Sequence, residues 1–411
     1  MFRSFLRLRV AAAGTLCTML LLPSFSTASD EWQEFFNTQL PKNSQAPGRY
    51  IVMMKEDTNY TTESVLQNAG VTSDTVFEKI KGFASSLTEA QITMLRRDPR
   101  VAFIEPDYQV QAFAQTLPTG INRIDTELNP RADIDGDNET TDVDIAIIDT
   151  GVQKTHPDLN VYKQVNFTNE YTADDLNGHG THVAGTAAAR DNGSGVVGVA
   201  PGARIWSVKV LNRQGSGYMS DIIEGIDYVT QNADSIEVAN MSLGCECISQ
   251  SLNAALDRSI AAGVVYTVAA GNSNKDASTF SPANHPKVIT VSAIADFNGQ
   301  PGGGAKSTCY SDVDDTFANF SNYGPLVEIA APGVCIYSTS RNSRYATLSG
   351  TSMASPHVAG AAALYLSTHP DASPDEVKNA LVAQAWSQTD GNGFSGEPDG
   401  NKEPLLNATN L

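Results

Sequence analysis

Short apolar runs alternate with longer stretches of mixed polarity over most of the chain. The run at residues 143–148 is mostly apolar, which predicts a strand buried on both faces of a sheet. Similar runs follow at residues 205–210, 238–242, 264–269, 288–292 and 326–330, with stretches of helical character between them. This alternation predicts an α/β fold in which helices cover both faces of a parallel sheet.

A second pattern occupies residues 50–114. Strands are predicted at residues 50–54, 76–83 and 101–105, with helices at 61–69 and 88–97 between them. These alternations indicate a small α+β module, separate from the larger domain that we assign to residues 115–411. A polar stretch that contains proline and glycine precedes the module, and it indicates a linker at residues 29–49.

The N-terminus has the pattern of a targeting segment. Arg3, Arg7 and Arg9 precede an apolar stretch at residues 10–22, and Ser26-Thr27-Ala28 then offers a small-residue cleavage site. This order is typical of a secretory signal peptide, here residues 1–28, so we expect a secreted protein. The run is short for a membrane anchor, and no later segment is apolar over ~20 residues. We therefore expect no membrane association after the signal is removed.

Composition narrows the possible partners. The chain has 411 residues, of which 41% are hydrophobic, so it is long enough to bury a large core. Its formal net charge of −19 argues against a nucleic-acid partner, because phosphate binding requires clustered lysine and arginine. We expect a monomer that uses no organic cofactor.

Four cysteines remain once the signal peptide, with Cys17, is removed. An even number in an exported chain indicates two disulfides, for which three connectivities exist. We favour Cys309 with Cys335 and Cys245 with Cys247, although the second pair closes a tight ring that requires a bend in the chain. A zinc site is the competing interpretation, disfavoured in an oxidising compartment.

Three segments carry candidate chemistry. Asp149 follows the strand at 143–148, at the edge where open α/β sheets place their ligands. His179 follows a glycine and opens a helix of small residues, and Ser352 occupies the same kind of position near the start of another such helix. A helix N-terminus favours a developing anion, which suits a nucleophilic serine. An acid, a base and a nucleophile placed at the same rim of the sheet are the groups that hydrolysis of an amide requires.

The blocks Asp149-Thr150-Gly151, His179-Gly180-Thr181-His182 and Gly350-Thr351-Ser352-Met353-Ala354 resemble those of the subtilisin-like serine proteases, or subtilases. Phe320-Ser321-Asn322-Tyr323-Gly324 is similar to the proteinase K branch. The resemblance implies a subtilisin-like α/β fold and a secreted serine endopeptidase. It also implies catalytic roles for Asp149, His179 and Ser352, and an oxyanion-binding role for Asn272.

The small module resembles the family's inhibitory propeptide at residues 81–84, 98–101 and 104–107. The resemblance implies that the chain is a self-processing zymogen, inhibited by its own propeptide. The tail at residues 108–113 would then lie in the cleft as an added strand, with cleavage between Ala112 and Leu117.

The resemblance also implies where peptide substrates and calcium bind. Two segments match the strands that border the cleft, and a third set matches a structural calcium site through two carbonyls and a carboxylate. The strands contain Ser242, Leu243 and Gly244, and Ala269, Ala270 and Gly271; the calcium ligands are Pro286, Val288 and Glu328, where the relative has aspartate in place of the glutamate. Cys245 stands where many relatives have glycine, and we expect a broad preference for apolar or aromatic side chains.

Several alternatives stay open. Asp133, Asp135 and Asp137 alternate as in the start of a calcium loop, but a solvated acidic loop explains them equally well. His182 with His179 would make a two-histidine metal site, although both His182 and His357 are better explained as packed core residues. A catalytically silent binding protein and an esterase are the alternatives to a peptidase.

Overall fold

The computed structural model describes residues 45–55, 61–108, 115–138 and 140–411. The chain forms two compact units that divide after Gln111. The predicted signal peptide, most of the predicted linker and the predicted tail beyond Tyr108 lie outside the described residues.

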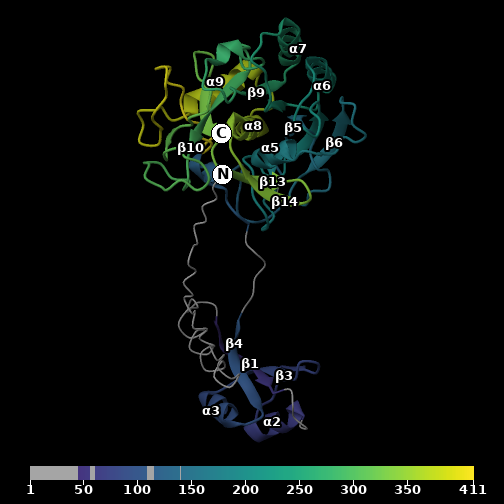
Figure 1. The fold of residues 1–411 in the computed structure, drawn as a ribbon, viewed down its shortest axis with the longest axis vertical. Helices are drawn as coiled ribbons and strands as arrows, with labels where there is room; N and C mark the ends of the chain where they lie inside the picture. The colour runs from purple at the N-terminus through teal and green to yellow at the C-terminus, as the bar shows by residue number, and fades with distance from the viewer. Residues whose placement is uncertain (1–44, 56–60, 109–114, 139) are drawn as a thin grey trace, which may run out of the picture. The chain divides into compact units, whose positions relative to one another are not determined.

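The smaller unit is a four-stranded antiparallel sheet with two helices (Figure 1). Its strands run in the order β2-β3-β1-β4, and Val52, Phe83 and Leu95 form part of its core. The elements are β1 Gln45–Met54, α2 Thr62–Ala69, β2 Thr75–Phe77, β3 Gly82–Ser86, α3 Glu89–Arg97 and β4 Val101–Tyr108. The α+β prediction for this unit is therefore confirmed.

Two details of that prediction are wrong. The single strand expected at residues 76–83 is a hairpin, because the chain turns before Gly82, where Lys81 has a positive φ of 47°. β1 starts at Gln45, inside the stretch assigned to the linker, because residue 45 already pairs with Tyr108 of β4.

The larger unit contains an eight-stranded sheet whose pairings are parallel except for that of β11 with β10. The strand order is β11-β10-β9-β8-β5-β7-β6, and β12 pairs with β10. The strands are β5 Asp144–Asp149, β6 Val161–Asn166, β7 Arg204–Lys209, β8 Val238–Met241, β9 Val265–Ala269, β10 Ile289–Ala295, β11 Thr316–Phe317 and β12 Ile329–Pro332. The predicted parallel strands are all present.

Helices cover both faces of this sheet (Figure 1). Side chains of β5 show the alternation: Ile145 and Ile147 pack with α5 and α8, whereas Ala146 and Ile148 pack with α6 and α7. The helices of the unit are α4 Thr119–Arg123, α5 His179–Ala188, α6 Met219–Gln231, α7 Gln250–Ala261, α8 Thr351–Thr368 and α9 Pro374–Gln384. The α/β prediction is confirmed, and two separate apolar layers hold the sheet between them.

The apolar pattern misses two features. β6 is a half-exposed edge strand that contains lysine and glutamine, so it has no apolar run to reveal it. The hairpin of β13 Ile336–Ser340 and β14 Arg344–Leu348 lies outside the main sheet and packs against α5. Within the part of the chain that the structure describes, no helix has both the length and the apolar character that a membrane span requires.

Candidate active site

Asp149 is the last residue of β5, and it is fully buried. β5 lies between β7 and β8 in the middle of the sheet, so its carboxyl end is enclosed on both sides. The carboxylate accepts a hydrogen bond from the backbone N–H of Thr150 at 2.6 Å. Its two oxygens lie 2.8 and 3.0 Å from Nδ1 of His179.

His179 reaches Asp149 because α5 begins beside the end of β5. Gly178 precedes the helix with a φ of 113°, a conformation that L side chains rarely adopt. A Cβ atom at Gly180 would overlap the carbonyl oxygen of Gly151 and lie 3.1 Å from Cβ of Asp149. Only glycine therefore allows the first turn of α5 this close to the strand end.

Asp175 joins the segments that contain Asp149 and His179, and no sequence motif marks it. It is 5% exposed, and its Oδ1 accepts from the hydroxyl of Thr150 at 3.0 Å and from N–H of Gly178 at 2.8 Å. Its Oδ2 accepts from both the N–H and the hydroxyl of Thr181. One buried carboxylate thus fixes the start of α5 against the end of β5.

The electrostatics around His179 favour its protonated form. Burial lowers the pKa of the imidazole, but the charge and hydrogen bond of Asp149, together with the charge of Asp175, raise it above its usual value. Because Nδ1 donates to Asp149, the neutral ring presents Nε2 as the proton acceptor. His179 also lines the cleft described below.

Ser352 lies in the first turn of α8, after Gly350 at the N-cap. Its hydroxyl donates to the carbonyl of Ser242 at 3.2 Å, and no hydrogen bond joins it to His179 within the described part of the chain. Catalytic hydrogen bonds are often formed only with substrate present, so this geometry agrees with a resting site. The predicted helix start near Ser352 is confirmed, because α8 begins at Thr351.

Asn272 follows β9, and its side chain is oriented by Thr351. Its Oδ1 accepts from the N–H of Thr351 at 2.8 Å and from the hydroxyl at 2.9 Å. The same hydroxyl accepts from N–H of Gly271 at 3.1 Å. With its oxygen held on this side, the amide NH2 is directed away from Thr351, and it makes no hydrogen bond to any described residue. It is available to a ligand.

Two hollows share a wall and together form the cleft. The larger, about 520 Å³, is lined by His179 and by Ser242, Leu243 and Gly244. The smaller, about 310 Å³, is lined by Ser352 and Asn272 and by Ala269, Ala270 and Gly271. The structure therefore brings His179, Ser352, Asn272 and both predicted substrate segments to one cleft, and Asp149 is buried in contact with His179.

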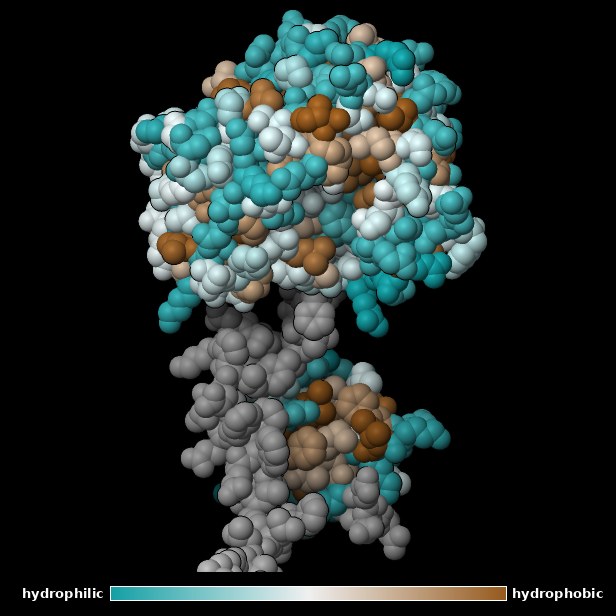
Figure 2. Space-filling model, turned by 45° about the horizontal axis from the view of Figure 1, so that its top comes forward, coloured by the Kyte–Doolittle hydropathy of each residue, from teal (hydrophilic) through white to brown (hydrophobic). Residues whose placement is uncertain are grey.

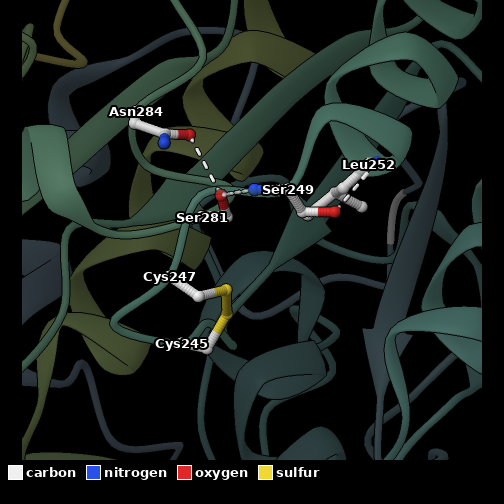
Figure 3. The surroundings of a disulfide bond; sticks show 6 residues. All are labelled: Cys245, Cys247, Ser249, Leu252, Ser281 and Asn284. Atoms are coloured by element: carbon white, nitrogen blue, oxygen red, sulfur yellow. Dashed lines mark hydrogen bonds between the residues drawn. A yellow bond between two sulfur atoms is a disulfide. The ribbon is translucent and has the colours of Figure 1, made fainter.

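The edge of the cleft carries the predicted disulfide between Cys245 and Cys247 (Figure 3). Cys245 exchanges two backbone hydrogen bonds with Ser281, at 3.0 and 3.1 Å. The hydroxyl of Ser281 in turn accepts from N–H of Ser249, which caps α7. The other favoured pair, Cys309 with Cys335, is also joined.

Lys209 is a second buried group that the sequence analysis missed. Its ammonium donates to the carbonyls of Thr150 and Leu211 at 2.7 Å and pairs with Glu170 at 2.9 Å. Although burial opposes it, hydrogen bonds from Arg213 and Lys209 lower the pKa of Glu170 to about 2. This pair supports the segment that follows Asp149.

His182, His357 and Asp135 make hydrogen bonds within the fold. His182 and His357 are buried, burial lowers the pKa of each to about 4, and they bond to backbone carbonyls, as expected of core residues. In the acidic loop, Asp135 accepts from N–H of Asp137. Among the described residues, no group of three or more His, Cys, Asp or Glu side chains is arranged to hold a metal ion.

The predicted calcium ligands converge on a different cation. The ammonium of Lys378, from α9, donates to the carbonyls of Pro286 and Val288 at 3.0 and 3.1 Å and to the carboxylate of Glu328. A calcium ion at this place would lie against a positive charge. These residues therefore do not fit calcium while Lys378 is protonated.

Comparisons with known proteins identify the family of this chain. Residues 140–404 match the model of the subtilase family, and residues 49–113 match that of the peptidase inhibitor I9. Subtilisin E of Bacillus subtilis is 36% identical over 379 residues, which cover 90% of this chain and 91% of that protein. The thermostable alkaline protease of Halalkalibacterium halodurans is 37% identical over 339 residues, 82% of this chain and 86% of that protein.

A solved structure of a subtilisin-like proteinase is also similar to this chain. The crystal structure of a cold adapted subtilisin-like serine proteinase superposes with a TM-score of 0.57 at 35% identity, covering 71% of this chain and 97% of that one. The parallel sheet, the cleft at its edge and these relatives define a serine endopeptidase. The chain belongs to the subtilase family, and an I9 inhibitor domain precedes its peptidase domain.

Proposed function

We propose that this chain is a secreted zymogen whose peptidase site uses Asp149, His179 and Ser352, with Asn272 in the oxyanion hole. The observation that carries the proposal is the hydrogen bond between buried Asp149 and half-buried His179, beside a cleft that also contains Ser352. Ser352 attacks the scissile carbonyl, and Nε2 of His179 accepts its proton and returns it to the leaving amine. Asp149 holds the imidazole in the required tautomer and stabilises its positive charge.

Oxyanion stabilisation comes from two donors. The amide NH2 of Asn272 is free for this purpose because Thr351 holds the amide oxygen. The second donor is the backbone N–H of Ser352, one of the first N–H groups of α8, which have no partner inside the helix. A side-chain donor of this kind typically contributes about 10²–10³ in turnover.

The inhibitory role proposed for the smaller unit is supported by its uncovered sheet face. Figure 2 shows apolar residues gathered on this unit. Val52 and Ile104 point to the helices and are buried, whereas Phe103 is 42% exposed and pairs in register with Met53. The smaller unit does not itself cover this apolar face, which leaves the face available for the inhibitory role.

Other expectations stay predictions. These are the closer likeness to the proteinase K branch, structural calcium binding, the monomeric state and the absence of a nucleic-acid partner. The preference for apolar or aromatic substrates also stays a prediction, and the small residues at 269–271 leave room for such side chains.

A serine-directed phosphonylating reagent tests the proposed function. We expect it to abolish peptide hydrolysis by the processed enzyme and to label Ser352, because the proposed mechanism makes this serine the nucleophile beside the amide of Asn272. Mass spectrometry of the peptides locates the label. Normal peptide turnover by fully phosphonylated protein would contradict the proposal, and hydrolysis of an ester without hydrolysis of a peptide would favour an esterase.

Activity is expected to fall on the acid side of a pKa that lies above the usual ~6.5 of histidine. His179 acts as a base only when neutral, and Asp149 and Asp175 raise its pKa. A plot of log kcat/KM against pH for a peptide substrate should rise with unit slope and level off above that pKa. His182, which faces His179 on α5, has its pKa lowered to about 4 and does not titrate in this range. A flat profile down to about pH 5, with circular dichroism showing intact fold, would exclude His179 as the base.

A further inference from the structure

Glu246 stands between the two cysteines of the disulfide at the cleft edge. Cys247 N–H bonds to the carbonyl of Cys245 at 2.8 Å, and Cys245 is held to Ser281 by two backbone hydrogen bonds. The disulfide closes this turn on itself, so the segment has little freedom to move away. Glu246 is consequently carried at a fixed place on the rim of the smaller hollow.

The smaller hollow receives one particular substrate side chain, if the proposed function holds. Ser352 and Asn272 both line it, so the residue that supplies the attacked carbonyl must place its side chain there. Small residues at 269–271 form one side, with Phe280 and Ala283 nearby. Glu246 is the one ionisable residue among its described lining residues, so it sets the charge of the hollow.

Lys275 neutralises that charge. Its ammonium lies 2.7 and 2.8 Å from the two carboxylate oxygens of Glu246. The N–H of Lys275 bonds to Oδ1 of Asn322 at 3.1 Å, which anchors the backbone of the lysine. The side chains of Lys275 and Glu246 are 51% and 55% exposed. Solvent therefore weakens their attraction for each other, and a bound substrate can approach either charge.

We propose that the Glu246–Lys275 pair determines the charge selectivity for the residue immediately before the cleaved bond. With both charges present, the rim is neutral and favours uncharged side chains. Removing Lys275 leaves a carboxylate at the mouth of the hollow, which favours lysine or arginine. Removing Glu246 leaves an ammonium, which favours glutamate. The inference rests on the proposed function, because it needs Ser352 as the nucleophile.

The test measures kcat/KM for four peptides that differ only in the residue before the cleaved bond: phenylalanine, glutamine, lysine or glutamate. Relative to the glutamine peptide, Lys275→Gln should raise the preference for lysine about three- to ten-fold, and Glu246→Gln should raise that for glutamate similarly. The double variant should restore the order found in the unmodified enzyme. Both effects should shrink between ~0.02 M and ~0.5 M salt.

A matched pair elsewhere serves as the control. Lys287 and Asp257 form an ion pair at 2.9 Å, are each 52% exposed and line neither hollow of the cleft. Lys287→Gln and Asp257→Asn change the net charge by the same amounts and should leave the substrate ratios unchanged. If they change the ratios as much as the cleft variants do, or if the cleft variants leave them unchanged, the inference is overturned. If the unmodified enzyme hydrolyses none of the peptides, the proposed function fails instead.

Discussion

Replacing Ser352 by alanine is expected to lower kcat by about 10⁶, the order found when a triad serine is removed from a subtilisin. The variant loses the nucleophile, and the oxyanion donors that remain stabilise only the slow attack of water. Because the proposed maturation uses the same site, the purified chain should also keep its smaller unit attached. Peptide hydrolysis and the mass of the isolated protein measure the two effects.

Ser355→Ala is the matched control for this variant. Ser355 lies one turn further along α8, is fully buried, and donates to Oδ1 of Asn240 at 2.7 Å. Its loss removes a hydroxyl from the same helix and lowers stability by about 1 kcal/mol, without touching the cleft. Processing by Ser352→Ala at the normal rate, in a preparation free of other peptidases, would remove Ser352 from the mechanism.

The local geometry of the triad segments could be predicted from sequence because each depends on neighbouring residues. The apolar run that ends at Asp149 and the glycine before His179 define a strand end and a helix start by themselves. The residues that join these segments were not predictable in this way. Asp175 reaches Thr150 across 25 residues, and Thr351 reaches Asn272 across 79. Such contacts have no local pattern.

The predicted calcium ligands also show that long-range contacts cannot be predicted from local sequence. Pro286, Val288 and Glu328 do converge, as the family resemblance implied, but the group at their centre comes from α9. Lys378 is 50 residues from Glu328 in the sequence and sits on an ordinary amphipathic helix. Nothing near it in the chain distinguishes it from a solvated surface lysine, so only the folded structure reveals what it binds.

The fold was predictable to the extent that strands were buried. Central strands such as β5 are apolar throughout, because both of their faces are covered. β6 at the sheet edge and the hairpin of β13 and β14 mix polar and apolar residues with neither a continuous apolar run nor a regular alternation, so the pattern does not mark them as strands. The hairpin matters for the site, since the carbonyls of Ile336 and Ala346 hold His182 beneath the first turn of α5.

Replacing Asp149 by asparagine is expected to lower kcat by about 10⁴. Thr150 N–H fixes one side-chain oxygen at 2.6 Å, so the new NH2 group takes the place of the other oxygen, which lies 3.0 Å from Nδ1 of His179. An amide that donates to Nδ1 puts the imidazole proton on Nε2. In that tautomer Nε2 of His179 carries the proton and has no lone pair with which to accept the proton of Ser352. Turnover of a peptide substrate measures the loss.

The same substitution should move the acid limb of the pH profile. Asp149 is the main group that raises the pKa of His179 against the opposing effect of burial, so without its charge the midpoint of the residual activity should shift to lower pH. Asp144→Asn is the control, because Asp144 lies at the opposite end of β5, is equally buried, and pairs with Arg204. It should leave the midpoint in place even if it lowers stability. An unshifted midpoint in Asp149→Asn would show that the carboxylate does not act through His179. A shifted midpoint together with the large loss in kcat would show that Asp149 acts on the charge and the tautomer of His179, because a merely structural role would not move the midpoint.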